Sequence, residues 1–155
     1  MLKRISSIVA VLLLSVLLTG ALTAAAPGPT PPNVTFTLVS GLPSTMNVGD
    51  TATVVVQVNS DQEFIWAHML PTFHFPGRGL MATDMGGDLD SRSTTATLTI
   101  TFVAKNSTVG LPDEGVCPAG GGLAPVAFVA GVRYPGGLVA AQRFPATGFY
   151  CVLVP

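Results

Sequence analysis

The chain has few charged residues, and those few do not cluster. Charged side chains make up 10% of its 155 residues, against roughly 25% in typical soluble domains. The basic residues beyond the N-terminal segment are Arg78, Arg92, Lys105, Arg133 and Arg143, and they form no basic stripe. Nucleic acids are bound largely through phosphates neutralised by clustered lysine and arginine. The sequence therefore predicts no nucleic-acid partner.

The sequence also lacks the motifs of common enzyme classes. It contains no Gly-x-Ser-x-Gly elbow, no phosphate-binding glycine loop and no His-Glu-x-x-His pair, which position a nucleophile, a phosphate or a zinc ion. A glycosidase needs two carboxylates at a fixed separation, and nothing selects a pair such as Asp88 with Glu114. The two histidines, His68 and His74, are too few for a zinc site, which takes three or four ligands. We therefore expect a protein without catalytic activity.

Residues 1–25 have the features of a secretory signal peptide. A basic head precedes the apolar run Ile8–Leu18 and the small-residue stretch Ala21–Ala26, which is the pattern that the export machinery recognises. We expect cleavage to leave Ala26 as the new N-terminus, and a secreted, periplasmic or cell-surface location. If the segment were kept, Ile5–Ala26 would be just long enough for a membrane anchor, since a spanning helix needs about 20 residues.

The rest of the chain divides into a spacer and one domain. Residues 26–33 contain four prolines, which predicts a stiff, extended spacer. Residues 34–155 are long enough for a single domain that buries a core without a metal. Beyond the N-terminal segment, five basic residues stand against eight acidic ones, a net charge of −3.

Cys117 and Cys151 are the only cysteines in the chain. In an exported protein such a pair is most simply a disulfide, with two free thiols as the alternative. The bond would pin the segment around Cys117 to the last strand. Closing a loop of that length stabilises a fold by about 3 to 4 kcal/mol on the chain-entropy model.

Alternating apolar and polar residues indicate β-strands in most of the domain. In Thr95–Val103 apolar residues alternate with threonines, so one face belongs to a core and the other forms a threonine ladder in water. The other expected strands are Val34–Leu38, Thr51–Asn59, Phe64–Phe75 with an interruption at Pro71, a hairpin of Val126–Tyr134 and Leu138–Phe144, and Phe149–Val154. Because no helical period is present, the sequence predicts an antiparallel, Ig-like β-sandwich of seven to eight strands. A closed eight-stranded barrel is the alternative.

Two of these segments resemble strands of bacterial extracellular Ig-like and cohesin-like modules. Val48–Val58 is similar to the start of their second strand, and Thr97–Lys105 to a later central strand. The resemblance implies an Ig-like sandwich at a cell surface and, for a cohesin, a dockerin partner. Both cysteines follow Trp66, whereas antibody-type domains have one on each side of the core tryptophan. We expect a structural, adhesive or protein-binding role, with a protein or glycan as partner.

The segment from Phe64 to Phe75 is unusually aromatic. Exposed, coplanar aromatic rings on a sandwich bind sugars by stacking on pyranose faces, which favours a carbohydrate-binding module as the alternative function. The candidate ligand-binding residues are Phe64, Trp66, Phe73 and Phe75. Large aromatic side chains are mostly buried, because they supply the most apolar area. The stronger expectation therefore places Trp66 in the core.

The acidic stretch 84–90 is the best metal candidate. Asp84, Asp88 and Asp90 lie around a pair of glycines, an arrangement that can present several oxygens to a calcium ion. The spacing is not that of an EF-hand, and aspartate and glycine are also ordinary turn residues. We expect no cofactor, and calcium is the one metal that the sequence allows.

Overall fold

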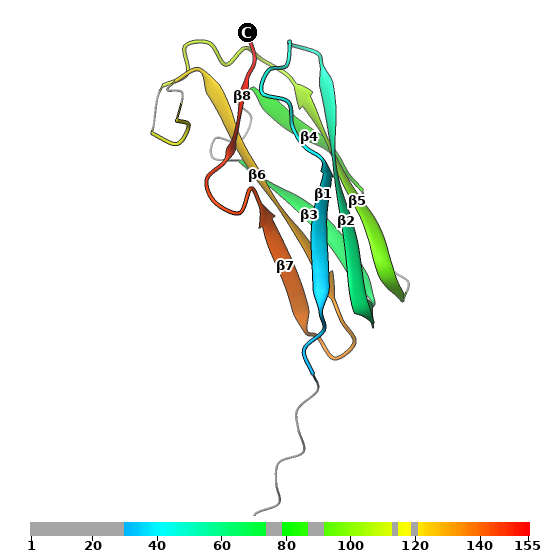
Figure 1. Ribbon diagram of the computed structural model, residues 1–155. Helices are drawn as coiled ribbons and strands as arrows, with labels where there is room; N and C mark the ends of the chain where they lie inside the picture. Colours follow the sequence, from blue (N-terminus) through cyan, green and yellow to red (C-terminus); the bar gives the residue numbers. More distant parts are fainter. Residues whose placement is uncertain (1–29, 74–78, 87–91, 113–114, 119–120) are drawn as a thin grey trace, which may run out of the picture. The chain divides into compact units, whose positions relative to one another are not determined.

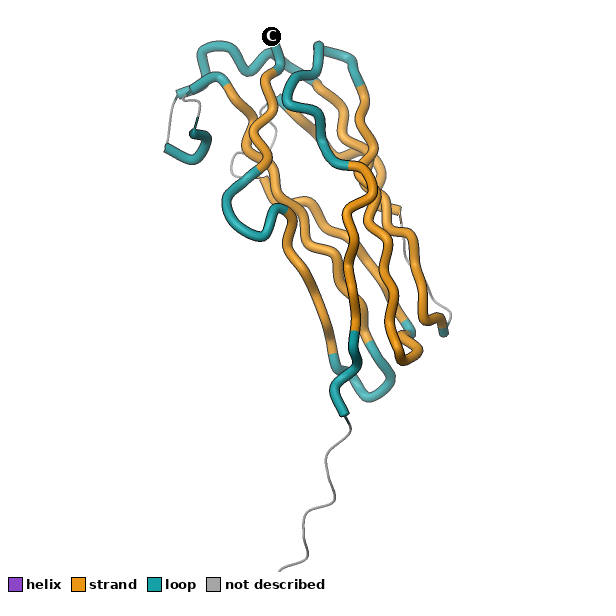
Figure 2. The backbone as a smooth tube through the Cα atoms, viewed as in Figure 1, coloured by secondary structure: helices purple, strands orange, loops and turns teal. Residues whose placement is uncertain are grey.

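The alternating segments of the sequence pair into two antiparallel sheets, which pack as a β-sandwich (Figures 1 and 2). The computed structural model describes residues 30–73, 79–86, 92–112, 115–118 and 121–155, and Pro32–Pro155 forms one compact unit. The prediction of an antiparallel β-sandwich of seven to eight strands is confirmed, since the described residues form eight. The barrel alternative is wrong, because these strands divide between two separate sheets.

Sheet A contains the threonine- and valine-rich strands. Its order is β1-β2-β5-β4, and the strands are β1 (Val34–Ser40), β2 (Thr51–Phe64), β4 (Leu80–Gly86) and β5 (Ser93–Ala104). The buried valines of β2 pair with buried apolar residues of β5: Val54 with Ile100, Val56 with Leu98, and Val58 with Ala96. The opposite face carries the predicted threonine ladder, in which the hydroxyls of Thr53 and Thr101 lie 3.2 Å apart.

Sheet B is built around one long central strand. Its strands are β3 (Trp66–Phe73), β6 (Leu123–Arg133), β7 (Val139–Phe144) and β8 (Tyr150–Leu153). β3 pairs with one side of β6, while β7 and β8 share the other side, β8 along residues 123–126 and β7 along residues 128–133. The predicted hairpin is confirmed, and its turn is closed by a hydrogen bond from the amide of Tyr134 to the carbonyl of Leu138.

The space between the sheets is filled by aliphatic and aromatic side chains. Phe128 of β6 stacks on Phe144 and on Tyr150, with ring centroids 5.5 Å away in both cases. Fully burying a side chain such as Phe128 contributes about 1.5–3 kcal/mol relative to leaving it exposed. Burial also raises the pKa of Tyr150 above its ordinary value, because desolvation disfavours the phenolate.

The chain passes from sheet A to sheet B within one residue, Ile65. Phe64 still pairs with Ser93 of β5, whereas Trp66 already pairs with Arg133 of β6. The buried positions accordingly shift by one residue, from Phe64 to Ala67 and then Met69, instead of continuing at every second position. The bend therefore turns Trp66 away from the core.

Pro71 does not interrupt the strand that contains it, so that expectation is wrong. β3 runs through Pro71, which pairs with Phe128 of β6. Proline has no amide hydrogen to donate, and it is tolerated in edge strands, where only one side of the strand is paired. β3 is an edge strand, since β6 is the only described strand that pairs with it.

The buried hydroxyl of Thr108 joins the long β5–β6 connection to the last residues of the domain. It donates to the carbonyl of Gly122 at 2.6 Å and accepts from the amide of Val154 at 2.9 Å. The amide of Thr108 donates to the carbonyl of Val154 at 2.8 Å. The methyl group of Thr108 packs so closely on Gly79 that a Cβ at that glycine would collide with it. Thr108 therefore connects the residues before β4, the residues before β6 and the last residues of the domain.

Replacing Thr108 by valine should lower the free energy of unfolding by about 1–3 kcal/mol, because the amide of Val154 and the carbonyl of Gly122 lose a buried partner while the shape is kept. Thr108→Ser is the matched control, since it keeps the hydroxyl. Urea unfolding of both variants is the measurement. Equal stabilities for the valine and serine variants would contradict this role of the hydroxyl.

Candidate functional site

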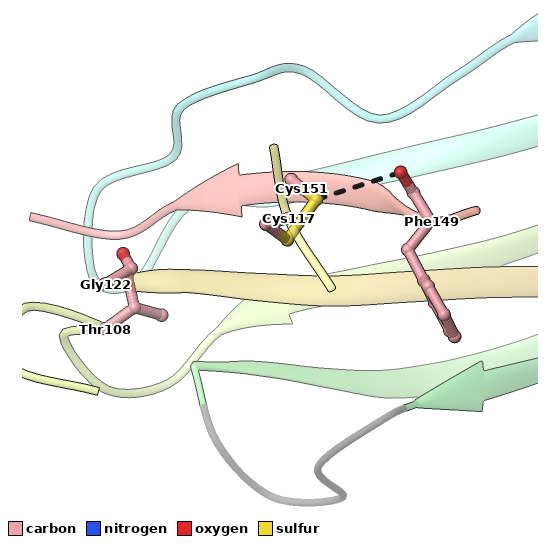
Figure 3. Close-up of a disulfide and its surroundings, with 5 residues drawn as sticks. All are labelled: Thr108, Cys117, Gly122, Phe149 and Cys151. Carbon is pink, nitrogen blue, oxygen red and sulfur yellow. Dashed lines mark hydrogen bonds between the residues drawn. A yellow bond between two sulfur atoms is a disulfide. The ribbon is translucent and has the colours of Figure 1, made fainter. Parts of the chain in front are cut away.

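The outer face of sheet B is covered at one end by the disulfide between Cys117 and Cys151. The bond is the predicted one, with the two Cα atoms 5.9 Å apart. Cys151 lies on β8, so the bond holds the loop that carries Cys117 against that strand (Figure 3). The Sγ of Cys151 lies 3.8 Å from the carbonyl oxygen of Phe149. Since a disulfide sulfur carries no proton, this is a contact and not a hydrogen bond.

Exposure along β6 shows where this cover ends. The outward-facing residues of β6 alternate with the core residues, and the first of them, Pro125 and Ala127, are nevertheless buried. Pro125 is the Cα partner of Cys151, which places it next to the disulfide. Val129 and Gly131 are partly exposed, and Arg133 is exposed. The outer face of sheet B therefore opens toward the end of the sheet at which β3 begins.

The open part of this face consists of three rows of residues that cross β3, β6 and β7, and we call it the open face. Residues that pair across neighbouring strands project from the same side of a sheet. The rows are Trp66, Arg133 and Val139; His68, Gly131 and Ala141; and Leu70, Val129 and Arg143. Apart from the His68 ring, the middle row is low, because Gly131 has no side chain and Ala141 has only a methyl group.

Trp66 and His68 form a stacked pair at the edge of the open face. Their ring centroids are 5.1 Å apart and the ring planes are inclined by 21°, which is an offset-stacked arrangement. Both side chains are partly exposed. The expectation that Trp66 is a core residue is therefore wrong, and the physical reason is the change of sheet at Ile65. Because one face of each ring lies against the other ring, the two rings are not side by side in one plane, as in the coplanar sugar-binding surface that the sequence suggested.

The other aromatic candidates do not join Trp66 on this face. Phe64 is fully buried and packs edge-to-face on Tyr134, with centroids 6.4 Å apart, so it has no surface to offer a ligand. Phe64 therefore cannot belong to an exposed aromatic surface with Trp66, as the sequence had suggested. The backbone of Phe73 ends β3, and Phe75 lies outside the described residues.

Two arginines supply the charge of the open face. Arg133 is exposed, and no described carboxylate forms an ion pair with it. Arg143 is partly buried: it donates to the carbonyl of Pro145 at 2.8 Å, and its guanidinium carbon lies 5.0 Å from the centroid of the Phe149 ring. Arg143 is thus held in place, whereas Arg133 points into water.

Little of the predicted calcium site falls within the described residues. Asp84 is exposed on β4, where it pairs with Thr101, while Asp88 and Asp90 lie outside the described residues, as does His74. In the part of the chain that the structure describes, no group of three or more metal-ligating side chains is present. Within the same residues, no helix is long and apolar enough to cross a membrane.

Sequence reasoning missed Gly131, Arg133 and Arg143 as members of the same surface. The hairpin pattern alone contains part of the signal, since alternation from a turn at Pro135–Gly137 puts both arginines on one face. The position of β3, which carries Trp66, beside β6 depends on pairing between strands far apart in the sequence. Local sequence patterns contain no information about such pairing. No protein-family model matches this chain, and no curated protein matches its sequence.

Reduction of the disulfide should lower the free energy of unfolding by about 3 to 4 kcal/mol, because the bond closes a loop with a sequence separation of 34 residues. The measurement is urea unfolding with and without a reductant. The double variant Cys117→Ser/Cys151→Ser is the control, and it should show the reduced stability without responding to the reductant. A wild-type midpoint that the reductant leaves unchanged would contradict the pairing.

Proposed function

We propose that this chain is an Ig-like, non-catalytic module of a secreted or cell-envelope protein, and that it acts by binding a protein or glycan through the open face. The observation that carries the proposal is the position of Trp66, the single tryptophan of the chain, which is partly exposed on a sheet face. Exposed tryptophan is enriched where proteins bind their partners, because one ring buries a large apolar area at little entropic cost.

The strand order supports the Ig-like assignment. One sheet has the order β1-β2-β5-β4, and in the other β6 lies between β3 on one side and β7 and β8 on the other. This arrangement corresponds to the A-B-E-D and C-F-G sheets of constant-type immunoglobulin domains.

Two features support a location outside the cytoplasm. The N-terminal 25 residues have the composition of a signal peptide. The disulfide is of the kind that persists in oxidising compartments and is rare in the cytosol.

Carbohydrate binding is the second candidate function, and the Trp66–His68 pair favours it. Trp66 is partly exposed and stacks on His68 with its ring centroid 5.1 Å away, and the apolar side of a sugar ring can lie against an exposed part of an indole ring. Gly131, the Cα partner of His68, has no side chain and so leaves room over the backbone next to the pair.

The full chain should bind isolated envelope material of the cells that produce it, and Trp66→Ala should weaken this binding about thirtyfold, as removal of an aromatic side chain that dominates an interface does. Co-sedimentation with increasing amounts of envelope material measures the affinity. Thr53→Ala, on the outer face of sheet A, is the matched control and should bind like the wild type. Thermal unfolding of each variant checks the fold.

A loss of binding in Thr53→Ala but not in Trp66→Ala would place the binding surface on sheet A and contradict the proposal. Protease treatment of the envelope material separates the two partner classes. It should abolish binding if the partner is a protein and leave it intact if the partner is a glycan.

A further inference from the structure

We infer that the open face takes an anionic polysaccharide, one whose sugar rings carry carboxylates; this inference rests on the proposed role of the open face in binding. The charges of the sandwich are unevenly distributed between its sheets. Although acidic residues outnumber basic ones beyond the N-terminal segment, none occurs in the four strands of sheet B. The three rows of the open face therefore combine an aromatic pair with the two positive charges of Arg133 and Arg143, and contain no carboxylate.

The four described acids, Asp50, Asp61, Glu63 and Asp84, lie in strands of sheet A or, for Asp50, directly before β2. Asp61 accepts a hydrogen bond from the amide of Asn33 at 2.9 Å, Glu63 lies 3.7 Å from Arg92, and Asp84 is on β4. None of these carboxylates pairs with Arg133 or Arg143 in the described part of the chain. Among the described residues, therefore, no carboxylate competes with an anionic ligand for either guanidinium group.

The spacing of the two arginines fits an extended ligand. Arg133 lies in the row of Trp66, and Arg143 lies in the row of Leu70, with the low row of Gly131 between them. The outer rows are four residues apart, about 13 Å along the strands. One small anion does not extend from one arginine row to the other, whereas a polymer with a carboxylate on successive sugars presents charges along its length.

The side chains of the open face match the two parts of such a ligand. A guanidinium group pairs with a carboxylate through two parallel hydrogen bonds. Arg143 keeps donors for this purpose, since its described hydrogen bond to Pro145 uses one terminal nitrogen. The sugar ring itself needs an aromatic surface with room next to it, and the exposed part of Trp66, with Gly131 and Ala141 in the neighbouring row, provides one.

Titration of the full chain with polygalacturonate in the presence of EDTA tests the inference, with the fully methyl-esterified polymer as the matched probe. The ester has the same sugar backbone without the charge. We expect binding to polygalacturonate at least about tenfold tighter than to the ester, and weaker at higher salt because exposed charges are screened.

Arg133→Gln should weaken the binding of polygalacturonate about tenfold or more, as the loss of a charge-assisted hydrogen bond does. Lys105→Gln is the control, because this substitution removes the same charge at a different place. Lys105 is exposed in the β5–β6 connection, away from the open face. Equal losses in both variants would show a non-specific charge effect and overturn the inference.

Two further results would overturn the inference while leaving the proposed function standing. One is equal binding of polygalacturonate and its ester, which would show that charge is not recognised. The other is binding to envelope material, lost in Trp66→Ala, by a chain that binds neither polymer. A chain that binds neither the polymers nor the envelope material would overturn both proposals.

Discussion

The change of sheet at Ile65 is the constraint on which the rest of the sandwich depends. A strand with one buried face places every second residue in the core, and β2 does so at Val54, Val56 and Val58. The bend at Ile65 carries the chain into the opposite sheet and moves the buried positions to Ala67 and Met69. The core thus keeps Phe64, and the outer surface receives Trp66, His68 and Leu70. The aromatic part of the open face is a consequence of this shift.

Much of the fold follows from local signals in the sequence. Period-two alternation locates β1, β2 and β5, and the Pro-Gly-Gly turn locates the β6–β7 hairpin, because both depend on residues close together in the chain. The predicted interruption at Pro71 was wrong because a proline is tolerated in a strand at the edge of a sheet, and the position of a strand in a sheet is not visible in the local sequence. Thr108 gave no signal, since the buried state of a threonine in a polar stretch is set by distant groups, here Gly122 and Val154.

The candidate site was predictable only in part. The disulfide followed from the cysteine count, and the aromatic segment drew attention to Trp66. Regular alternation would make Phe64 and Trp66 neighbours on one face, and the one-residue shift at Ile65 separates them. Arg133 joins Trp66 through pairing between strands that are far apart in the sequence. The surface is therefore a tertiary feature, assembled by a bend and a strand order.

Acrylamide quenching of Trp66 fluorescence tests the central claim directly, because the chain has no other tryptophan. The comparison is with the same chain unfolded in urea and with N-acetyltryptophanamide. A partly exposed ring stacked on His68 should be quenched clearly, although less than in the unfolded chain, with emission between the buried and the free limits. Emission that is strongly blue-shifted and resistant to acrylamide would place Trp66 in the core and contradict the shift at Ile65.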